Sequence, residues 1–195
     1  MGIHEDIAAY TPFNEQEAAD KRTMLAALEH DPFCFDRRSQ AHYTCSVWTV
    51  DEAMEQTLFV YHDIYDSWSW VGGHADGERD LAVVALRELE EETGVAGARL
   101  ALCEESGILS LETLTVDGHE KRGVYVSSHL HLNVTYLAVA DPIEPLRCAP
   151  RENSAVAWMP MQEAIARSTE PWIREHIYRK IAAKLDALRR NGRLP

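Results

Sequence analysis

The sequence lacks the features of a membrane-spanning, disulfide-bonded or DNA-binding protein. It contains no apolar run of about 18 residues, and its start, MGIHEDIAAY, lacks a basic region followed by an apolar one, so we expect neither a membrane span nor a signal peptide. It has only four cysteines and no CxxC pair, which indicates the reduced thiols of a cytoplasmic protein. Its 19 basic residues face 32 acidic ones, and the net charge of −13 repels a nucleic-acid backbone and argues against a general nucleic-acid binder.

The chain does have the composition of a folded domain. Apolar residues make up 46% of its 195 positions, which is enough for a sizeable core in a single domain. We expect a helical extension at 1–40, a core at 41–160 and C-terminal helices at 161–195. Strands are predicted at 42–50, 58–62, 98–106, 109–116, 124–139 and 155–159, and helices at 14–29, 160–166 and 171–190, besides one that ends at Gly94.

This interleaving predicts the α/β class, with an α/β/α sandwich around a mixed sheet and helical additions at both ends. The sequence does not fix an oligomeric state, although the helical additions are candidates for a homodimer surface.

The most informative segment is GGHADGERDLAVVALRELEEETGV, at 72–95. Its acids Glu88, Glu90, Glu91 and Glu92 crowd into the last turns of the predicted helix. Carboxylates at a helix C-terminus oppose the macrodipole, and like charges three or four residues apart repel each other. A sequence that breaks local rules in this way usually serves a site.

Helix geometry separates these acids into two groups. Glu91 and Glu92 project within about 60° of Glu88, on either side of it, while Glu90 points away. Ala82, Ala85, Leu86 and Leu89 form the predicted apolar stripe beside them. Three convergent oxygen donors suit Mg²⁺ or Mn²⁺, ions that also bind substrate phosphates.

The same segment resembles the Nudix box, G-x5-E-x7-R-E-U-x-E-E-x-G-U, where U is aliphatic. Eight of nine positions match, from Gly73 at the opening glycine to the unbroken second half at Arg87, Glu88, Leu89, Glu91, Glu92, Gly94 and Val95. The first glutamate of the box falls on Arg79, and the nearest acid, Glu78, lies one residue early. This departure puts the fine tuning of the metal site in doubt more than metal binding itself.

The resemblance implies the Nudix architecture and a set of roles. Glu88, Glu91 and Glu92 would be metal ligands, with the backbone carbonyl of Gly72 as a further oxygen. Arg87 would orient the box glutamates. Glu152, six residues before Trp158, is a candidate for the additional loop carboxylate, so Glu88 and Glu152 compete for the role of general base.

Other polar and aromatic residues are candidate substrate contacts. His74 follows the two glycines, where phosphates would lie, although stabilising the turn is its more common role. Arg122 belongs to a basic turn, GHEKRG, and Trp70 offers a stacking surface, although packing is its more common role. His129 and His131 share one strand face, a spacing that weakly resembles a zinc site but has no convincing third ligand, so we expect them to line the cleft.

Together these features predict a Mg²⁺-dependent hydrolase that cleaves a phosphoanhydride bond. The expected substrate is a nucleoside diphosphate linked to another moiety, or a related small phosphorylated metabolite. Two alternatives stay open. An isopentenyl-diphosphate-isomerase-like enzyme would need a reactive cysteine, for which Cys45 and Cys103 are candidates. A non-catalytic nucleotide-sensing Nudix module would usually lose the box glutamates.

Overall fold

The computed structural model describes residues 2–103, 105–121, 123–150 and 152–194. No helix in these ranges is long and apolar enough to cross a membrane. The helices are α1 (Ile3–Ala9), α2 (Glu15–His30), α3 (Leu81–Thr93), α4 (Met161–Arg167), the π-helical segment η1 (Ile173–Tyr178) and α5 (Arg179–Arg190). The strands are β1 (Ala41–Val50), β2 (Gln56–His62), β3 (Ser67–Ser69), β4 (Val71–His74), β5 (Arg99–Leu100), β6 (Ser110–Val116), β7 (His119–Lys121), β8 (Val124–Val126), β9 (His129–Val139) and β10 (Asn153–Pro160).

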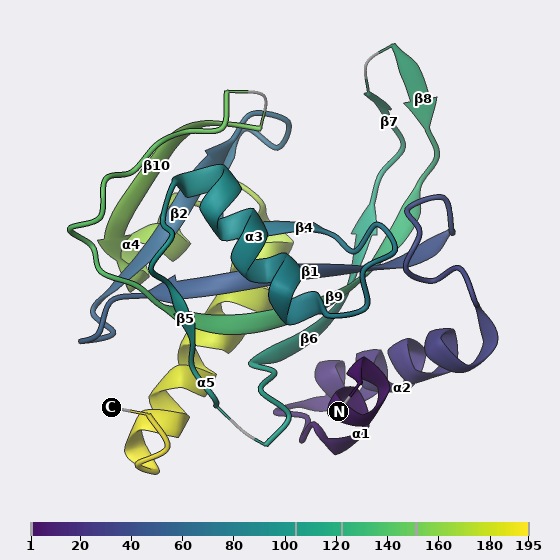
Figure 1. The fold of residues 1–195 in the computed structure, drawn as a ribbon, viewed down its shortest axis with the longest axis horizontal. Helices are drawn as coiled ribbons and strands as arrows, with labels where there is room; N and C mark the ends of the chain where they lie inside the picture. The colour runs from purple at the N-terminus through teal and green to yellow at the C-terminus, as the bar shows by residue number, and fades with distance from the viewer. Residues whose placement is uncertain (1, 104, 122, 151, 195) are drawn as a thin grey trace.

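A mixed sheet forms the centre of the molecule. Strands β10, β2, β1, β9 and β5 follow one another, while β3 pairs with β2, β4 with β1, and β6 with β9. The long strands β1 and β9 are parallel, and β4 runs antiparallel to β1. Strands β7 and β8 form a separate ribbon that projects away from the sheet (Figure 1).

The sheet is covered on both faces, as predicted for an α/β/α sandwich. In Figure 1, α3 crosses one face and α5 lies behind the other. Alternate residues of β1 divide between two cores: Tyr43 and Cys45 pack with α1, α2 and α3, whereas Trp48 and Val50 pack with α4, η1 and α5. Because side chains alternate between the two faces along a strand, His42, Thr44 and Ser46 point to the same face as Trp48, the face covered by η1.

The predicted start of α2 at Asn14 and the predicted end of α3 at Gly94 are confirmed. The side chain of Asn14 accepts a hydrogen bond from the Glu17 N–H and caps α2, and Asp80 caps α3 through the Val83 N–H. Helix α3 ends at Gly94, which has a φ of 81° that favours glycine.

The buried face of α3 differs from the predicted stripe. Leu81, Val84, Ala85 and Leu89 are buried, while Ala82 and Leu86 are only half-buried. Since Val84, Glu88 and Glu92 are four residues apart, they lie on one face. The two glutamates therefore continue the buried face of α3.

Several predicted elements are wrong in extent. The single strand expected at 124–139 is two strands, because 127 and 128 separate the exposed β7–β8 ribbon from the buried β9. The strand expected at 98–106 shrinks to β5, the loop before the box contains β3 and β4, and α1 was not predicted. At the start of the helix predicted at 171–190, Trp172 is 49% exposed, whereas Ile177, Ile181 and Leu185 further along are buried.

A buried network of charges ties both terminal extensions to the sheet. Glu17 of α2 lies 3.2 Å from the Lys180 ammonium of α5, and Lys180 lies 3.0 Å from Glu112 of β6. Lys184 also faces Glu17, at 3.9 Å. Two acids and two lysines balance in charge, which keeps each of them compatible with burial.

Candidate functional site

The two glycines before His74 bring strand β4 close to helix α3. A Cβ at Gly73 would lie 2.6 Å from Glu88 Oε1, so only glycine leaves room for this carboxylate. The Gly72 N–H lies near enough to the Glu92 carboxylate to oppose a rise in its pKa. The backbone carbonyl of Gly72 remains a predicted metal ligand.

Glu92 is the most buried acid of the box. It is 4% exposed, although neighbouring Glu91 on the same turn is exposed. Burial, followed by the nearby charges of Glu152 and Glu88, raises the pKa of Glu92 to about 8, and hydrogen bonds from Asn153 and Gly72 offset only part of this effect. The fold therefore buries Glu92 where its ionised form is unfavourable, and a bound cation would stabilise that form.

Arg87 connects two of the other box acids. Its guanidinium lies 3.1 Å from Glu88 Oε1 and 4.0 Å from a carboxylate oxygen of Glu91. Burial of Glu88 raises its pKa, while Arg87 opposes that change. This contact places Arg87 where it orients the Glu88 and Glu91 carboxylates.

Glu152 approaches the box from the loop before β10. It is exposed, and its charge raises the pKa of both Glu88 and Glu92, so the three carboxylates lie in one electrostatic cluster. The next residue, Asn153, donates from its side chain to the Glu92 backbone carbonyl at 3.0 Å and so holds this loop against the end of α3.

These residues fit a divalent cation. The predicted donors are carboxylate oxygens and one backbone carbonyl, the hard ligands that Mg²⁺ and Mn²⁺ prefer. A buried glutamate that faces two further acids is also an electrostatic cost that a bound cation removes. In the described ranges, however, no three carboxylate oxygens lie within 4.8 Å of one another, and the outermost ligand candidate, Glu91, stays in solvent beside Arg87.

The position of the first box glutamate is filled differently here. Arg79 lies over the ring of Phe35 at 4.8 Å, and the Glu78 carboxylate accepts hydrogen bonds from the N–H groups of Arg79 and Asp80. Both side chains are therefore engaged in the structure of the loop.

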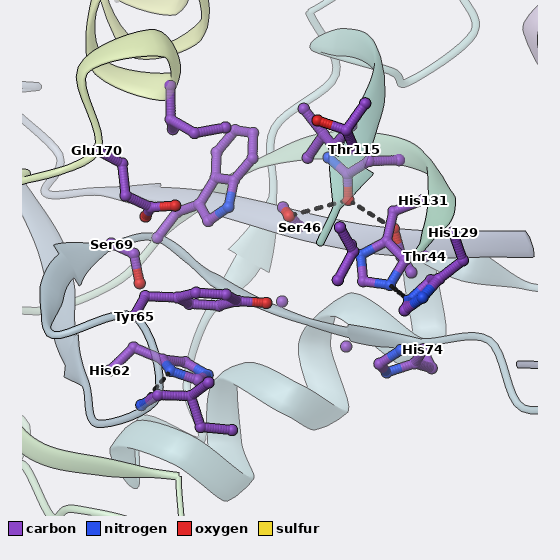
Figure 2. Close-up of a pocket in the computed structure, with 18 of the residues that line it drawn as sticks. Thr44, Ser46, His62, Tyr65, Ser69, His74, Thr115, His129, His131 and Glu170 are labelled. Atoms are coloured by element: carbon purple, nitrogen blue, oxygen red, sulfur yellow. Dashed lines mark hydrogen bonds between the residues drawn. The ribbon is translucent and has the colours of Figure 1, made fainter. Parts of the chain in front are cut away.

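A pocket of about 560 Å³ lies on the η1 face of the sheet and reaches Glu92 and Gly72. At one end are Tyr65 and His62, whose rings lie 4.5 Å apart, and at the other end are His74, His129 and His131 (Figure 2). Thr44 and Ser46 lie between the two ends, where both donate hydrogen bonds to the Asn133 side chain.

The predicted substrate contacts therefore meet in one pocket, with one exception. His74, His129, His131 and Trp70 all line it, and Trp70 also packs against the ring of Tyr178 at 5.2 Å. Arg122 lies outside the described residues.

Sequence reasoning missed several lining residues, including His42, Ser46, Tyr65 and Glu170. The polar residues His42, Thr44 and Ser46 alternate along β1, which is a sequence signal for one polar strand face. Only the pairing of β1 with His131 and Asn133 of β9 shows that this face belongs to the pocket.

The two candidate cysteines do not supply a reactive thiol. Cys45 faces α3, and burial raises its pKa to about 12, which leaves the thiol protonated at neutral pH. Cys103 is buried in the core beneath α5. The feature that an isomerase-like enzyme would need is therefore absent from these positions.

The fold and the acidic site define a hydrolase class, and comparison with known proteins agrees. The sequence matches the NUDIX domain over residues 40–181, from the start of β1 into α5. The chain therefore belongs to the Nudix family, and by class it is a pyrophosphohydrolase that acts on phosphoanhydrides.

Solved structures share the fold at low sequence identity. A binary complex of the C. elegans Ap4A hydrolase has a TM-score of 0.52 at 19% identity, covering 74% of this chain and 98% of that one. The E. coli dihydroneopterin triphosphate pyrophosphohydrolase has a TM-score of 0.52 at 15% identity, covering 72% and 95%. Comparison with curated proteins found no relative of this chain.

Proposed function

We propose that this protein is a Mg²⁺- or Mn²⁺-dependent hydrolase that cleaves a nucleoside diphosphate linked to another moiety, or a related phosphorylated metabolite. The observation that carries the proposal is Glu92, a buried acid that faces Glu88 and Glu152 at the edge of a large pocket. A bound cation would stabilise these carboxylates and lie where a phosphate could reach it.

In this proposal, the position of each residue determines its role. Glu88, Glu91, Glu92 and the Gly72 carbonyl hold the cation, and Arg87 orients Glu88 and Glu91. When bound, the cation neutralises phosphoryl oxygens and makes water more acidic. The histidine end of the pocket, with His74, His129 and His131, lies beside Gly72 and receives the diphosphate.

Of the two candidates for general base, we favour Glu152. Glu88 is fixed between Gly73 and the Arg87 guanidinium, whereas Glu152 is exposed to water beside the same cluster. A carboxylate open to solvent accepts a proton from the attacking water and releases it again.

We expect Glu152→Gln to lower kcat by about 100-fold, because the substitution removes a proton acceptor. The affinity for Mg²⁺, measured by calorimetry, should change little. Glu88→Gln should instead weaken Mg²⁺ binding. The opposite pattern would give the role of base to Glu88.

The aromatic end of the pocket favours a substrate with a flat ring. Tyr65, His62 and Trp70 present faces or edges on which a nucleobase stacks. The distribution of aromatic and polar residues suits a molecule that carries its heterocycle at one end and its diphosphate at the other.

The function is tested by a substrate panel in Mg²⁺ or Mn²⁺, with release of phosphate or nucleoside monophosphate as the measurement. The panel contains nucleoside diphosphate sugars, dinucleotides, nucleoside triphosphates, coenzyme A, Ap4A and dihydroneopterin triphosphate. We expect turnover of at least one compound, lost on chelation and restored by Mg²⁺. Ligand-dependent shifts in melting temperature without turnover would favour a sensor.

The glycine at 73 provides a second prediction. We expect Gly73→Ala to reduce kcat/KM by about 100-fold, since the new methyl group displaces the Glu88 carboxylate. Gly77→Ala is the matched control in the same loop: it meets no atom within 4 Å but has a φ of 94°, so it should lower stability and spare activity. Equal kcat/KM in the two variants would show that activity does not depend on the position of the Glu88 carboxylate against Gly73.

We also propose that the protein acts in the cytoplasm as a single domain on small substrates. None of its four cysteines, all of which lie in the described ranges, forms a disulfide. The acidic net charge of −13 disfavours a nucleic-acid polymer as the substrate.

A further inference from the structure

Four histidines gather at one end of the pocket. The rings of His42, His74 and His131 lie 5.0–5.3 Å apart between centroids, and His129 lies 5.0 Å from His131. One ligand atom from each of His42, His74 and His131 falls within 4.8 Å of the other two. In the described parts of the chain, this is the only group of three histidine, cysteine or acidic side chains that converges so closely.

Strand register produces this convergence. His42 of β1 pairs with His131 of β9, and Thr44, two residues further along β1, pairs with His74 of β4. Side chains at these positions point to the same face of the sheet. The three imidazoles thus come from three strands of a rigid sheet, an arrangement that suits a preorganised site.

His42 carries the most direct indication of a ligand. It is 1% exposed, and its Nδ1 lies 2.9 Å from the Ser39 carbonyl, to which it donates. Because Nδ1 donates its proton to Ser39, the lone pair of the neutral ring lies on Nε2. This atom is buried and has no hydrogen-bond partner. A ligating histidine commonly donates its other N–H to a backbone carbonyl, as His42 does to Ser39.

His129 supports the group from the side. Its Nδ1 lies 2.8 Å from the Ser127 carbonyl and its Nε2 lies 3.2 Å from His131 Nε2. The two Nε2 atoms of His129 and His131 therefore share one hydrogen bond. This contact orients the His131 ring, the supporting role that outer hydrogen bonds have around metal ligands.

We propose that His42, His74 and His131 form a second metal site, for a transition-metal dication of the Zn²⁺ type. Three neutral imidazoles are ligands that Zn²⁺ and Co²⁺ accept and that Mg²⁺, which prefers oxygen, does not. Three protein ligands leave one position open, as in zinc sites that bind a substrate or water.

The histidine site is separate from the carboxylate site. Gly73 faces α3 and Glu88, whereas His74, the next residue along β4, faces the pocket. The two sites therefore differ in donor atoms, although Glu92 and the three histidines border the same pocket. An ion held by the histidines would offer its open position to phosphate oxygens of the pocket's ligand.

The test uses tag-free protein stripped of metal and then titrated with Co²⁺ in excess Mg²⁺. We expect one Co²⁺ per chain, visible d–d absorption bands and displacement by Zn²⁺. His74→Ala and His131→Ala should each weaken Co²⁺ binding by at least about 100-fold. Both residues are half-buried, so these variants test the site without removing the buried His42, and melting of the metal-free variants shows that they fold.

Two controls separate this site from the rest of the chain. His30→Asn, on the exposed end of α2, should keep the Co²⁺ bands, and so should Glu92→Gln. Loss of the bands in Glu92→Gln would assign the ion to the carboxylates and overturn the proposal without touching the proposed hydrolysis. Binding that survives both histidine substitutions would also overturn it. Histidine-dependent binding in a protein that hydrolyses nothing would refute the hydrolase alone.

Discussion

Glu92→Gln is expected to reduce Mg²⁺-dependent hydrolysis by more than about 100-fold while leaving the metal-free fold intact or slightly more stable. The substitution removes a ligand, and it also removes a buried carboxylate that Glu88 and Glu152 disfavour. Asn153 and the Gly72 N–H lie near this carboxylate and lower its pKa, and a glutamine oxygen keeps an acceptor for them. The measurements are kcat/KM with Mg²⁺ and the melting temperature after chelation.

Glu91→Gln should also abolish the activity, although Glu91 is exposed, and Glu90→Gln is the matched control. Glu90 lies on the same helix and is exposed on its far side, so its removal should leave kcat/KM unchanged. A Glu92→Gln protein that melts far below the wild type without metal would show that the acid is structural. Full activity in Glu92→Gln would remove the central ligand from the proposed site.

The second large effect concerns stability. Glu17→Ala is expected to lower the free energy of unfolding by about 3–5 kcal/mol, because it leaves Lys180 and Lys184 buried with only Glu112 to balance them. Tyr10 and Ser110 also donate to Glu17 and would lose their acceptor. Urea denaturation at neutral pH measures the change, and Glu15→Ala, exposed in the same turn of α2, should have little effect.

The effect of Glu17 has a defined pH dependence. Burial alone would raise its pKa, but Lys180, Lys184 and hydrogen bonds from Tyr10 and Phe13 outweigh burial and lower it below the ordinary 4.5. A lowered folded-state pKa contributes stability above the unfolded value, and this stability is lost as pH falls through the folded value. The wild type should therefore exceed Glu17→Ala most at neutral pH and by less below pH 4.5. A difference that stays constant with pH would exclude the ion pairs as its cause.

Local sequence rules predicted the parts of the fold that depend on local physics. Asn14 and Gly94 mark helix ends through capping and a positive φ, which depend on a few neighbouring residues. The acids of the box were recognisable because they oppose the helix dipole. The period of strand β9 likewise placed His129 and His131 on one face.

Features made by distant segments were not predictable in this way. The histidines that converge with His131 come from β1 and β4, and only the parallel register of β1 with β9 brings His42 opposite His131. Glu17 and Lys180 meet across more than 160 residues and look like ordinary surface charges in the sequence. The break between β8 and β9 lies at the end of the sheet. The β-branched residues at 124–139 favour a strand throughout and do not indicate this break.

The glycine pair in β4 has a consequence for how both regions respond to change. With no side chain at Gly73, the backbone of β4 lies directly against Glu88 of α3, and the next residue along this strand is His74 of the imidazole group. Movement of this backbone on one side is transmitted directly to the other, so occupancy of either location should alter the affinity of its neighbour. Two ions coupled through the glycines of β4 would then bind one substrate at two points simultaneously.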